Sequence, residues 1–200
     1  ESYIGFDINK SINYFTIVAN QANLDEKNKL NDISIYNNHS YSNYNVDKNR
    51  IIANSLYRLG NIYLENNFIA HDIEKAIYYY TQAANKNHQL ALNELGFLYY
   101  NGFYISPDIN KAIYYLSLAA NQNNPKAQYN LGIIYYQGKY IKRDINKSIL
   151  YLTASAKQDD SNAQFNLGSI YYEGKYIKRD INKAIQYYTL AAKNNNLNAL

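Results

Sequence analysis

The hydrophobic positions between residues 127 and 157 have the period of two short α-helices. In the segment 127–138, Leu131 and Tyr135 stand four residues apart, which is the spacing of one helical face. A second such face follows between residues 145 and 157, where the apolar and small positions are Ile145, Ser148, Ile149, Leu152 and Ala156. The pattern predicts a helix–turn–helix unit.

The residues between the two predicted helices carry the signals that end one helix and begin the next. Gly138 can adopt the left-handed conformation that commonly follows a helix. Asp144 can accept hydrogen bonds from the first amides of the following helix, so it is the predicted N-cap. The polar loop KYIKR joins these two residues, and the turn is therefore predicted between residues 138 and 144.

The whole unit recurs with a step of 36 residues. Leu-Gly pairs occur at Leu59-Gly60, Leu95-Gly96, Leu131-Gly132 and Leu167-Gly168, and Asp-Ile-x-Lys begins at Asp72, Asp108, Asp144 and Asp180. A glycine inside a helix costs about 1 kcal/mol relative to alanine, so its recurrence predicts close helix packing that a Cβ atom would obstruct. One unit cannot bury its apolar face alone, and stacked units would share one continuous core.

These positions resemble the Sel-1-like repeat, a relative of the tetratricopeptide repeat. The matching residues, repeated in register, are Ala127, Leu131, Gly132, Tyr135, Gly138, Asp144, Lys147, Tyr151 and Ala156. The resemblance covers nearly all of residues 52–200 and also 7–19. Two departures are tyrosine where the family has tryptophan, as at Tyr79, and Asn66 in place of a loop glycine. The resemblance implies an all-α fold, a right-handed α-α superhelix (solenoid) of 36-residue helix–turn–helix repeats.

The repeat register predicts how the chain is organised. Residues 1–20 are expected to hold only the second helix of a partial repeat, and residues 21–50 an Asn-rich insertion or linker with one short helix near 24–36. Residues 51–200 are expected to hold four tandem repeats that start near residues 52, 91, 127 and 163, with the start of a further repeat at 199. We therefore expect the natural array to continue in both directions. The insertion is interpreted as low-complexity sequence, with a docking or phosphorylation loop as the alternative.

The amino-acid composition excludes several kinds of chemical site. The chain has 25 Tyr and 6 Phe but no Cys, so it has no disulfide, thiolate nucleophile or cysteine metal site. Its histidines, His39, His71 and His88, do not have the spacing of metal ligands, and no glycine-rich phosphate loop is present. The recurring Asp144 and Asp180 could suggest paired carboxylates, but their place at a helix start favours capping. We expect neither catalysis nor a cofactor or bound metal.

The inner surface of the array is the first candidate site. In tetratricopeptide-like stacks the first helices line a concave face, and by analogy the inward residues here are Tyr57, Asn61, Leu64, Glu65, Asn93, Phe97, Tyr100, Asn101, Tyr129, Ile133, Tyr136, Gln137, Phe165, Ser169, Tyr172 and Glu173. Aromatic rings supply contact area and amides can pair with a peptide backbone. This set suits an extended peptide or a helix of another protein, although the first aromatic residue of each group can equally be core.

A basic loop edge is the second candidate site. The ten residues GKYIKRDINK are identical at 138–147 and 174–183. Stacking would align the cations of the two copies along one edge: Lys139, Lys142, Arg143, Lys147, Lys175, Lys178, Arg179 and Lys183. Such an edge could attract an acidic partner, an anionic membrane or RNA, or it could be an ordinary solvated surface. The formal net charge is only +4, which disfavours nucleic acid.

Together these observations favour a scaffold or adaptor that binds a protein or peptide and has no small-molecule substrate. The resemblance adds that such arrays serve in signalling and in protein degradation, in some organisms beside a kinase domain. It also adds an alternative, a bacterial enzyme of cell-wall or β-lactam chemistry, but those relatives are disulfide-rich. A binder of anionic surfaces or nucleic acid through the basic edge is the third hypothesis. No apolar run approaches the ~18 residues of a membrane span, membrane contact is left open, and a cytoplasmic location is favoured.

Overall fold

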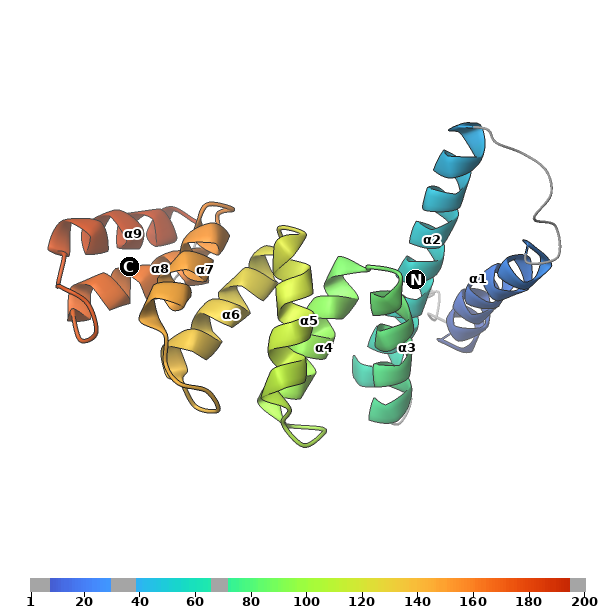
Figure 1. The fold of residues 1–200 in the computed structure, drawn as a ribbon, viewed down its shortest axis with the longest axis horizontal. Coiled ribbons are helices and arrows are strands. Elements are labelled where there is room, and N and C mark those ends of the chain that lie inside the picture. Colours follow the sequence, from blue (N-terminus) through green and yellow to red (C-terminus); the bar gives the residue numbers. More distant parts are fainter. Residues whose placement is uncertain (1–7, 30–38, 66–71, 195–200) are drawn as a thin grey trace, which may run out of the picture. The chain divides into compact units, whose positions relative to one another are not determined.

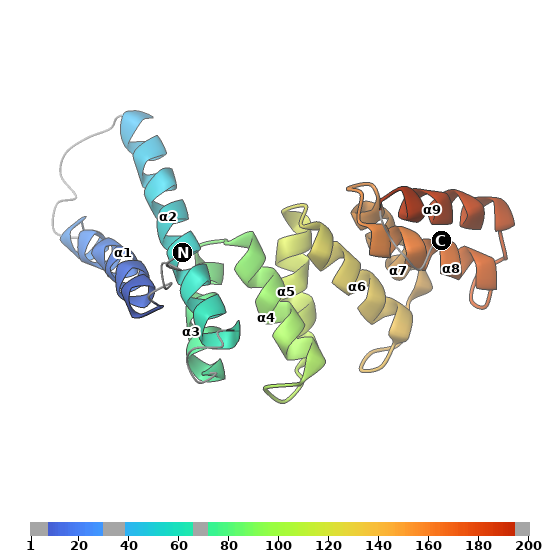
Figure 2. The same cartoon turned by 180° about the vertical axis from the view of Figure 1, so that it is seen from behind.

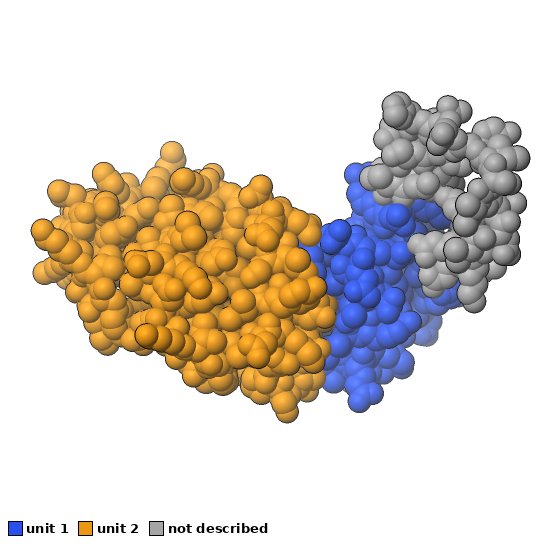
Figure 3. Space-filling view, in the orientation of Figure 1, with its two compact units in different colours: residues 1–92 blue, residues 93–200 orange. Residues whose placement is uncertain are grey.

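The computed structural model describes residues 8–29, 39–65 and 72–194, and all the regular structure in these ranges is α-helical (Figure 1). The predicted all-α fold of repeated helix pairs is therefore confirmed for this part of the chain (Figure 2). The chain divides into two compact units, residues 1–92 and 93–200 (Figure 3). Each unit is described by itself.

The described residues of the first unit form three complete helices and the first residues of a fourth. These are α1 (Ile8–Lys29), α2 (His39–Glu65), α3 (Ile73–Asn85) and the beginning of α4 (Gln89–Asn101). Helix α2 packs against both α1 and α3. The fully buried side chains include Leu59 of α2 and Tyr80 of α3, so the core of this unit lies between these two helices.

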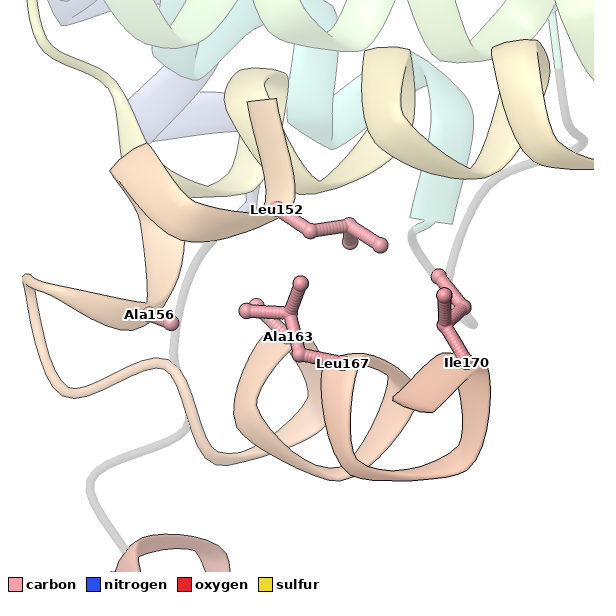
Figure 4. Packing of buried hydrophobic residues seen from close by; sticks show 5 residues of the cluster. All are labelled: Leu152, Ala156, Ala163, Leu167 and Ile170. Atoms are coloured by element: carbon pink, nitrogen blue, oxygen red, sulfur yellow. The ribbon is translucent and has the colours of Figure 1, made fainter. Parts of the chain in front are cut away.

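The second unit contains the rest of α4 and five further helices. They are α5 (Ile109–Asn121), α6 (Pro125–Gln137), α7 (Ile145–Ala156), α8 (Ser161–Glu173) and α9 (Ile181–Lys193). Helix α6 pairs with α7, and α8 pairs with α9. In Figure 4, Leu152 of α7 points toward Leu167 and Ile170 of the next helix pair. The core therefore runs from one repeat into the next.

The chain is more helical around the predicted insertion than its sequence indicates. Residues 21–29 continue α1, and residues 39–50 form the first part of α2. Of the short helix expected near 24–36, residues 24–29 belong to α1, while 30–36 fall outside the described residues. The segment LDEKNK contains good helix formers, Leu, Glu and Lys, and their propensity outweighs the asparagines that suggested a loop.

The predicted N-caps are confirmed in all four second helices. In α3, α5, α7 and α9 the aspartate before the helix accepts a hydrogen bond of 3.0 Å from the backbone nitrogen three residues later. The same lysine also forms an ion pair with that aspartate, as Lys147 does with Asp144. The lysine ammonium lies about 5 Å from the ring centroid of a tyrosine in the preceding helix. That tyrosine stacks on a second tyrosine, and the four stacked pairs are Tyr63 with Tyr79, Tyr99 with Tyr115, Tyr135 with Tyr151 and Tyr171 with Tyr187.

The two predicted roles of glycine are also confirmed. Gly138 has a φ of +62°, the left-handed conformation expected of a helix end. Gly132 lies inside α6, where an added Cβ atom would come within 2.6 Å of the Leu152 side chain in α7. The glycine therefore allows the two helices of the repeat to approach more closely than alanine would permit.

Two buried glutamines connect neighbouring repeats. Gln128 donates from Nε2 to the Ala120 carbonyl at 3.3 Å and accepts from the Gln158 amide at 2.8 Å. One repeat further along, Gln164 donates to the Ala156 carbonyl at 3.0 Å and accepts from the Asn194 amide at 3.1 Å. We call Gln128 and Gln164 the glutamine clasps. Each holds the first helix of a repeat between the ends of two second helices.

Two buried serines of α7 offer a matched test of polar burial. Within the described part of the chain the hydroxyl of Ser148 has no hydrogen-bond partner, whereas Ser155 donates to the Pro125 carbonyl at 2.8 Å. We expect Ser148→Ala to raise the free energy of unfolding by about 1 kcal/mol, because it removes an unsatisfied buried group. Ser155→Ala should lower it by about 1 kcal/mol. Urea unfolding of both variants tests the pair, and equal effects of the two changes would contradict the assignment.

His88 acts as the N-cap of α4. Its Nδ1 accepts a hydrogen bond of 3.2 Å from the Ala91 backbone, and its Nε2 lies 2.8 Å from Asn54 Oδ1. The corresponding caps of α6 and α8 are Asn124 and Asp160, which accept from Ala127 and Ala163 at 2.9 Å. The imidazole caps only while Nδ1 carries no proton. Burial, followed by the positive charge of Arg58, lowers the pKa of His88 below its ordinary value of 6.5.

This cap predicts a pH dependence of stability. Because the folded pKa of His88 is lowered, the unfolded chain binds more protons, and stability falls as the pH drops below about 6.5. We expect His88→Asn, which copies Asn124, to remove part of this fall while retaining the cap. Urea unfolding of both proteins between about pH 7.5 and 5.5 measures the two slopes. Identical slopes would show that His88 does not cap α4 in its neutral form.

Candidate interaction surface

The predicted inward residues of the first unit lie mainly in its packing. Tyr57 is half-buried and stacks on His88, with 4.8 Å between the ring centroids. Asn61 accepts a hydrogen bond of 2.8 Å from the Tyr80 hydroxyl. Leu64 is buried in the structure, so it does not contribute to an accessible surface. The side chain of Glu65 lies outside the described residues.

In the second unit the predicted residues of α4, α6 and α8 bond to one another between repeats. Tyr100 donates to Gln137 Oε1, and Tyr136 donates to Glu173 Oε2 at 3.4 Å. Asn93 accepts from the Asn130 amide at 3.2 Å. The Asn166 amide donates to the Tyr129 hydroxyl at 3.5 Å. These four bonds, all between residues 37 positions apart, are called the groove ladder.

The members of this surface differ in their exposure. Among the aromatic members, Phe97 and Tyr172 are the most exposed, with 43% and 52% of their surface exposed, and Gln137 and Glu173 are exposed as well. Asn93 is buried, and its inclusion in an accessible surface is corrected, because Glu94 and Asn130 enclose its amide. Of the remaining members, Ile133 packs against the core, Phe165 lies against Tyr188 with 5.5 Å between ring centroids, and Asn101 is half-buried. Ser169 accepts from Tyr188 at 3.1 Å.

The cations of the basic edge are largely held by tyrosines. Lys139 lies 4.6 Å from the ring centroid of Tyr140, and Lys175 lies 5.2 Å from that of Tyr176. Arg179 lies 4.9 Å from the ring centroid of Tyr172. Lys142 and Lys178 are exposed and have no partner among the residues that the structure places. Lys147 and Lys183 are engaged with their N-cap aspartates.

Arg143 joins two neighbouring loops. Its Nε donates to the Tyr136 carbonyl at 2.7 Å and its Nη2 to the Gln137 carbonyl at 3.3 Å, which satisfies carbonyls at the end of α6. The guanidinium also lies 4.3 Å from the ring centroid of Tyr176 in the following loop. Arg143 therefore has a structural role that the sequence pattern, which showed only a cation, did not reveal.

Within the second unit, the predicted residues of α4 and α6 contact the loops of the basic edge. Tyr100 meets the loop residue Tyr140 edge to face, and Tyr136 meets Tyr176 in the same way, with ring centroids about 6 Å apart. Burial raises the pKa of Tyr100 and Tyr136 above 10, and the Glu173 carboxylate raises that of Tyr136 further. Both hydroxyls therefore remain protonated donors. Tyr140 and Tyr176 were not among the predicted site residues, although their presence in both copies of GKYIKR was the available signal.

The described residues do not contain a cluster of three or more His, Cys, Asp or Glu side chains able to hold a metal ion. None of the helices in the described ranges is both long enough and apolar enough to cross a membrane. What the structure does provide in the second unit is an aromatic, amide-lined and cationic surface. Such side chains are common in interfaces between polypeptides.

The fold and this surface define a class of protein, the arrays of short helical hairpin repeats. Within that class, the sequence profile of the Sel1 repeat matches residues 53–88, 89–124, 125–160 and 161–196, and the chain belongs to the Sel1 repeat family. The recognised resemblance is thereby confirmed. Members of this family are in general non-catalytic scaffolds for protein interactions.

Solved structures of Sel1 repeat proteins share the fold. A protective antigen of uropathogenic Escherichia coli with this fold is 30% identical with a TM-score of 0.69, over 74% of this chain and 32% of the antigen. A Sel1 repeat protein of Oxalobacter formigenes is also 30% identical with a TM-score of 0.68, over 78% of this chain and 69% of that protein. The chain therefore spans about a third of the length of the antigen. A comparison with curated protein sequences gives no match.

Cysteine rich protein B of Helicobacter pylori is a more distant structural relative. It is 27% identical with a TM-score of 0.50, over 63% of this chain and 90% of that protein. The present chain has no cysteine at all. Its repeats are thus held together without disulfides, through apolar contacts, the glutamine clasps and the groove ladder.

Proposed function

We propose that this chain is a protein-interaction module and that α4, α6 and α8 of the second unit bind an extended segment of a partner protein. Exposed Phe97 and Tyr172, together with the half-buried rings of Tyr100 and Tyr136, supply apolar contact area. Aromatic residues of this kind dominate the energy of many protein interfaces. Membership of a scaffold family supports the same function.

The observation that carries this proposal is the groove ladder. Because Tyr100, Tyr136 and Asn166 already bond between repeats, the aromatic surface is fixed in position before a partner arrives. A surface that is held in its binding geometry loses little conformational entropy on binding. The exposed rings can therefore contribute most of their contact energy to affinity.

The experiment is a selection of random linear peptides on the immobilised chain, followed by affinity measurements on the enriched peptides. We expect Phe97→Ala with Tyr172→Ala to weaken binding by at least about tenfold. The control variant, Tyr114→Ala with Leu150→Ala, removes two exposed apolar side chains from the second helices α5 and α7. It should leave binding within about twofold. Loss of binding in the control alone would place the interaction on the second helices and contradict the proposal.

A further inference from the structure

We infer that the partner segment is acidic where it passes from the surface of α4, α6 and α8 onto the two loops 138–144 and 174–180, and that these loops bind its carboxylates. This inference rests on the proposed function, since it concerns the same partner. The loops adjoin the groove through the contacts of Tyr100 with Tyr140 and of Tyr136 with Tyr176. A segment bound along α6 and α8 therefore passes beside the loop cations.

The electrostatics of the two loops favour an anionic ligand. Each loop carries three cations and one aspartate. That aspartate, Asp144 or Asp180, caps the following helix and pairs with Lys147 or Lys183, at 3.8 and 3.7 Å. A lysine of the following helix thus balances the aspartate of each loop. The three cations of the loop are not balanced in this way. Adjacent repeats place the two cationic loops next to each other, as the contact of Arg143 with Tyr176 shows.

The structure separates the cations that support the fold from those that can bind a partner. Arg143 caps α6 and contacts Tyr176. Lys142 and Lys178 are exposed, and within the described ranges they contact neither a carboxylate nor a ring. These two lysines occupy equivalent positions in the identical loops, so they present a pair of charges in register. They are the residues assigned to the acidic segment.

Ring geometry favours a polypeptide over nucleic acid. Binding of single-stranded nucleic acid uses open aromatic faces on which bases stack. Here the ring of Tyr140 is covered by Lys139, and that of Tyr176 by Arg143 and Lys175. Both rings also meet a groove tyrosine edge to face. Each loop ring therefore already has at least one cation over it, which leaves less open face for a base to stack on.

An anionic membrane fits this surface less well than a peptide. Membrane-surface binding combines cations with apolar side chains that enter the lipid. The most exposed apolar residue, Phe103 with 83% of its surface exposed, lies in the loop 102–108. That loop has Ser106 and Pro107 at the positions of Lys142 and Arg143, and it carries no cation. The apolar and cationic features thus lie in different loops.

The test measures binding of a labelled peptide of alternating Glu and Ser by fluorescence anisotropy. We expect Lys142→Glu with Lys178→Glu to weaken binding by at least about tenfold, and the neutral Gln substitutions at the same sites to weaken it less. The control, Lys126→Glu with Lys157→Glu, makes the same change in net charge at exposed positions away from the loops, and it should leave affinity within about twofold. Binding should also fall as salt rises, because the added ions screen exposed charges.

Three results would overturn the inference. They are equal loss in the control variant, equal binding of a Gln–Ser peptide, and tighter binding of an oligothymidine or of phosphatidylserine vesicles that depends on Lys142 and Lys178. Failure of the inference is distinguishable from failure of the proposed function. Suppose that the selected peptides require Phe97 and Tyr172 for binding, carry no excess of acidic residues and bind equally well without Lys142 and Lys178. That result would support the proposed function and refute the acidic segment.

Discussion

Replacing Gly132 with alanine should lower the free energy of unfolding by about 2 kcal/mol, although alanine is the better helix former by about 1 kcal/mol. The added Cβ atom would meet Leu152 Cγ at 2.6 Å, Leu152 Cδ2 at 2.8 Å and the Leu152 backbone nitrogen at 3.2 Å. Leu152 is fully buried in the core shared by α7 and α8, so it cannot turn away. The helices α6 and α7 would have to separate. Urea unfolding followed by circular dichroism measures the loss.

Gly168 provides the matched control in the next repeat. There the atoms nearest to an added Cβ atom would be ring atoms of Tyr188, at 2.7 to 3.1 Å, and this side chain is half-exposed whereas Leu152 is fully buried. We expect Gly168→Ala to lower stability by less than Gly132→Ala. The double variant Gly132→Ala with Leu152→Ala should be less unstable than the sum of its single changes, since the new methyl group occupies part of the space left by leucine. Strict additivity would refute the close contact as the cause.

Replacing Gln164 with leucine should lower the free energy of unfolding by about 2 kcal/mol. The side chain is 1% exposed and forms two hydrogen bonds, to the Ala156 carbonyl and from the Asn194 amide. Leucine fills similar space but cannot form either hydrogen bond. The Ala156 carbonyl and the Asn194 amide would each lose a partner, and buried polar groups without partners lower the free energy of unfolding. The measurement is again urea unfolding.

The same change at an exposed glutamine serves as the control for Gln164→Leu. Gln186 of α9 is exposed, and Gln186→Leu should change stability by less than about 0.5 kcal/mol. If the two variants were equally stable, the clasp at Gln164 would contribute nothing to the connection between repeats.

The sequence predicted the features that depend on local backbone chemistry. The caps at Asp144 and Asp180, the left-handed Gly138 and the close approach at Gly132 all follow from one residue type at one position in the repeat. The 36-residue step then fixed which helices form pairs. The caps and the left-handed glycine act within a few residues, and the close approach of Gly132 to Leu152 lies within one repeat, so none of these features requires knowledge of how repeats stack.

Contacts between repeats could not be predicted in the same way. The role of Arg143 depends on Tyr176, which lies 33 residues further along the chain and reaches it only after stacking. The bonds of Gln128 with the Ala120 carbonyl and of Asn93 with Asn130 likewise form only when two different repeats are stacked. Of these residues, Asn93 and Arg143 were predicted to lie on an accessible surface, and their partners show that part of that surface is occupied. The binding roles of the groove and the loops stay predictions.

The groove ladder gives the second unit a translational symmetry. Its bonds join residues 37 positions apart, and each glutamine clasp also reaches back to the preceding repeat, from Gln128 to the Ala120 carbonyl and from Gln164 to the Ala156 carbonyl. Each connection therefore ends in the neighbouring repeat, and the unit is a one-dimensional lattice with nearest-neighbour coupling. A tandem duplication of residues 125–160 would regenerate its own connections on both sides. The length of the recognition surface can thus change in whole steps of one repeat while the chemistry of each step is preserved.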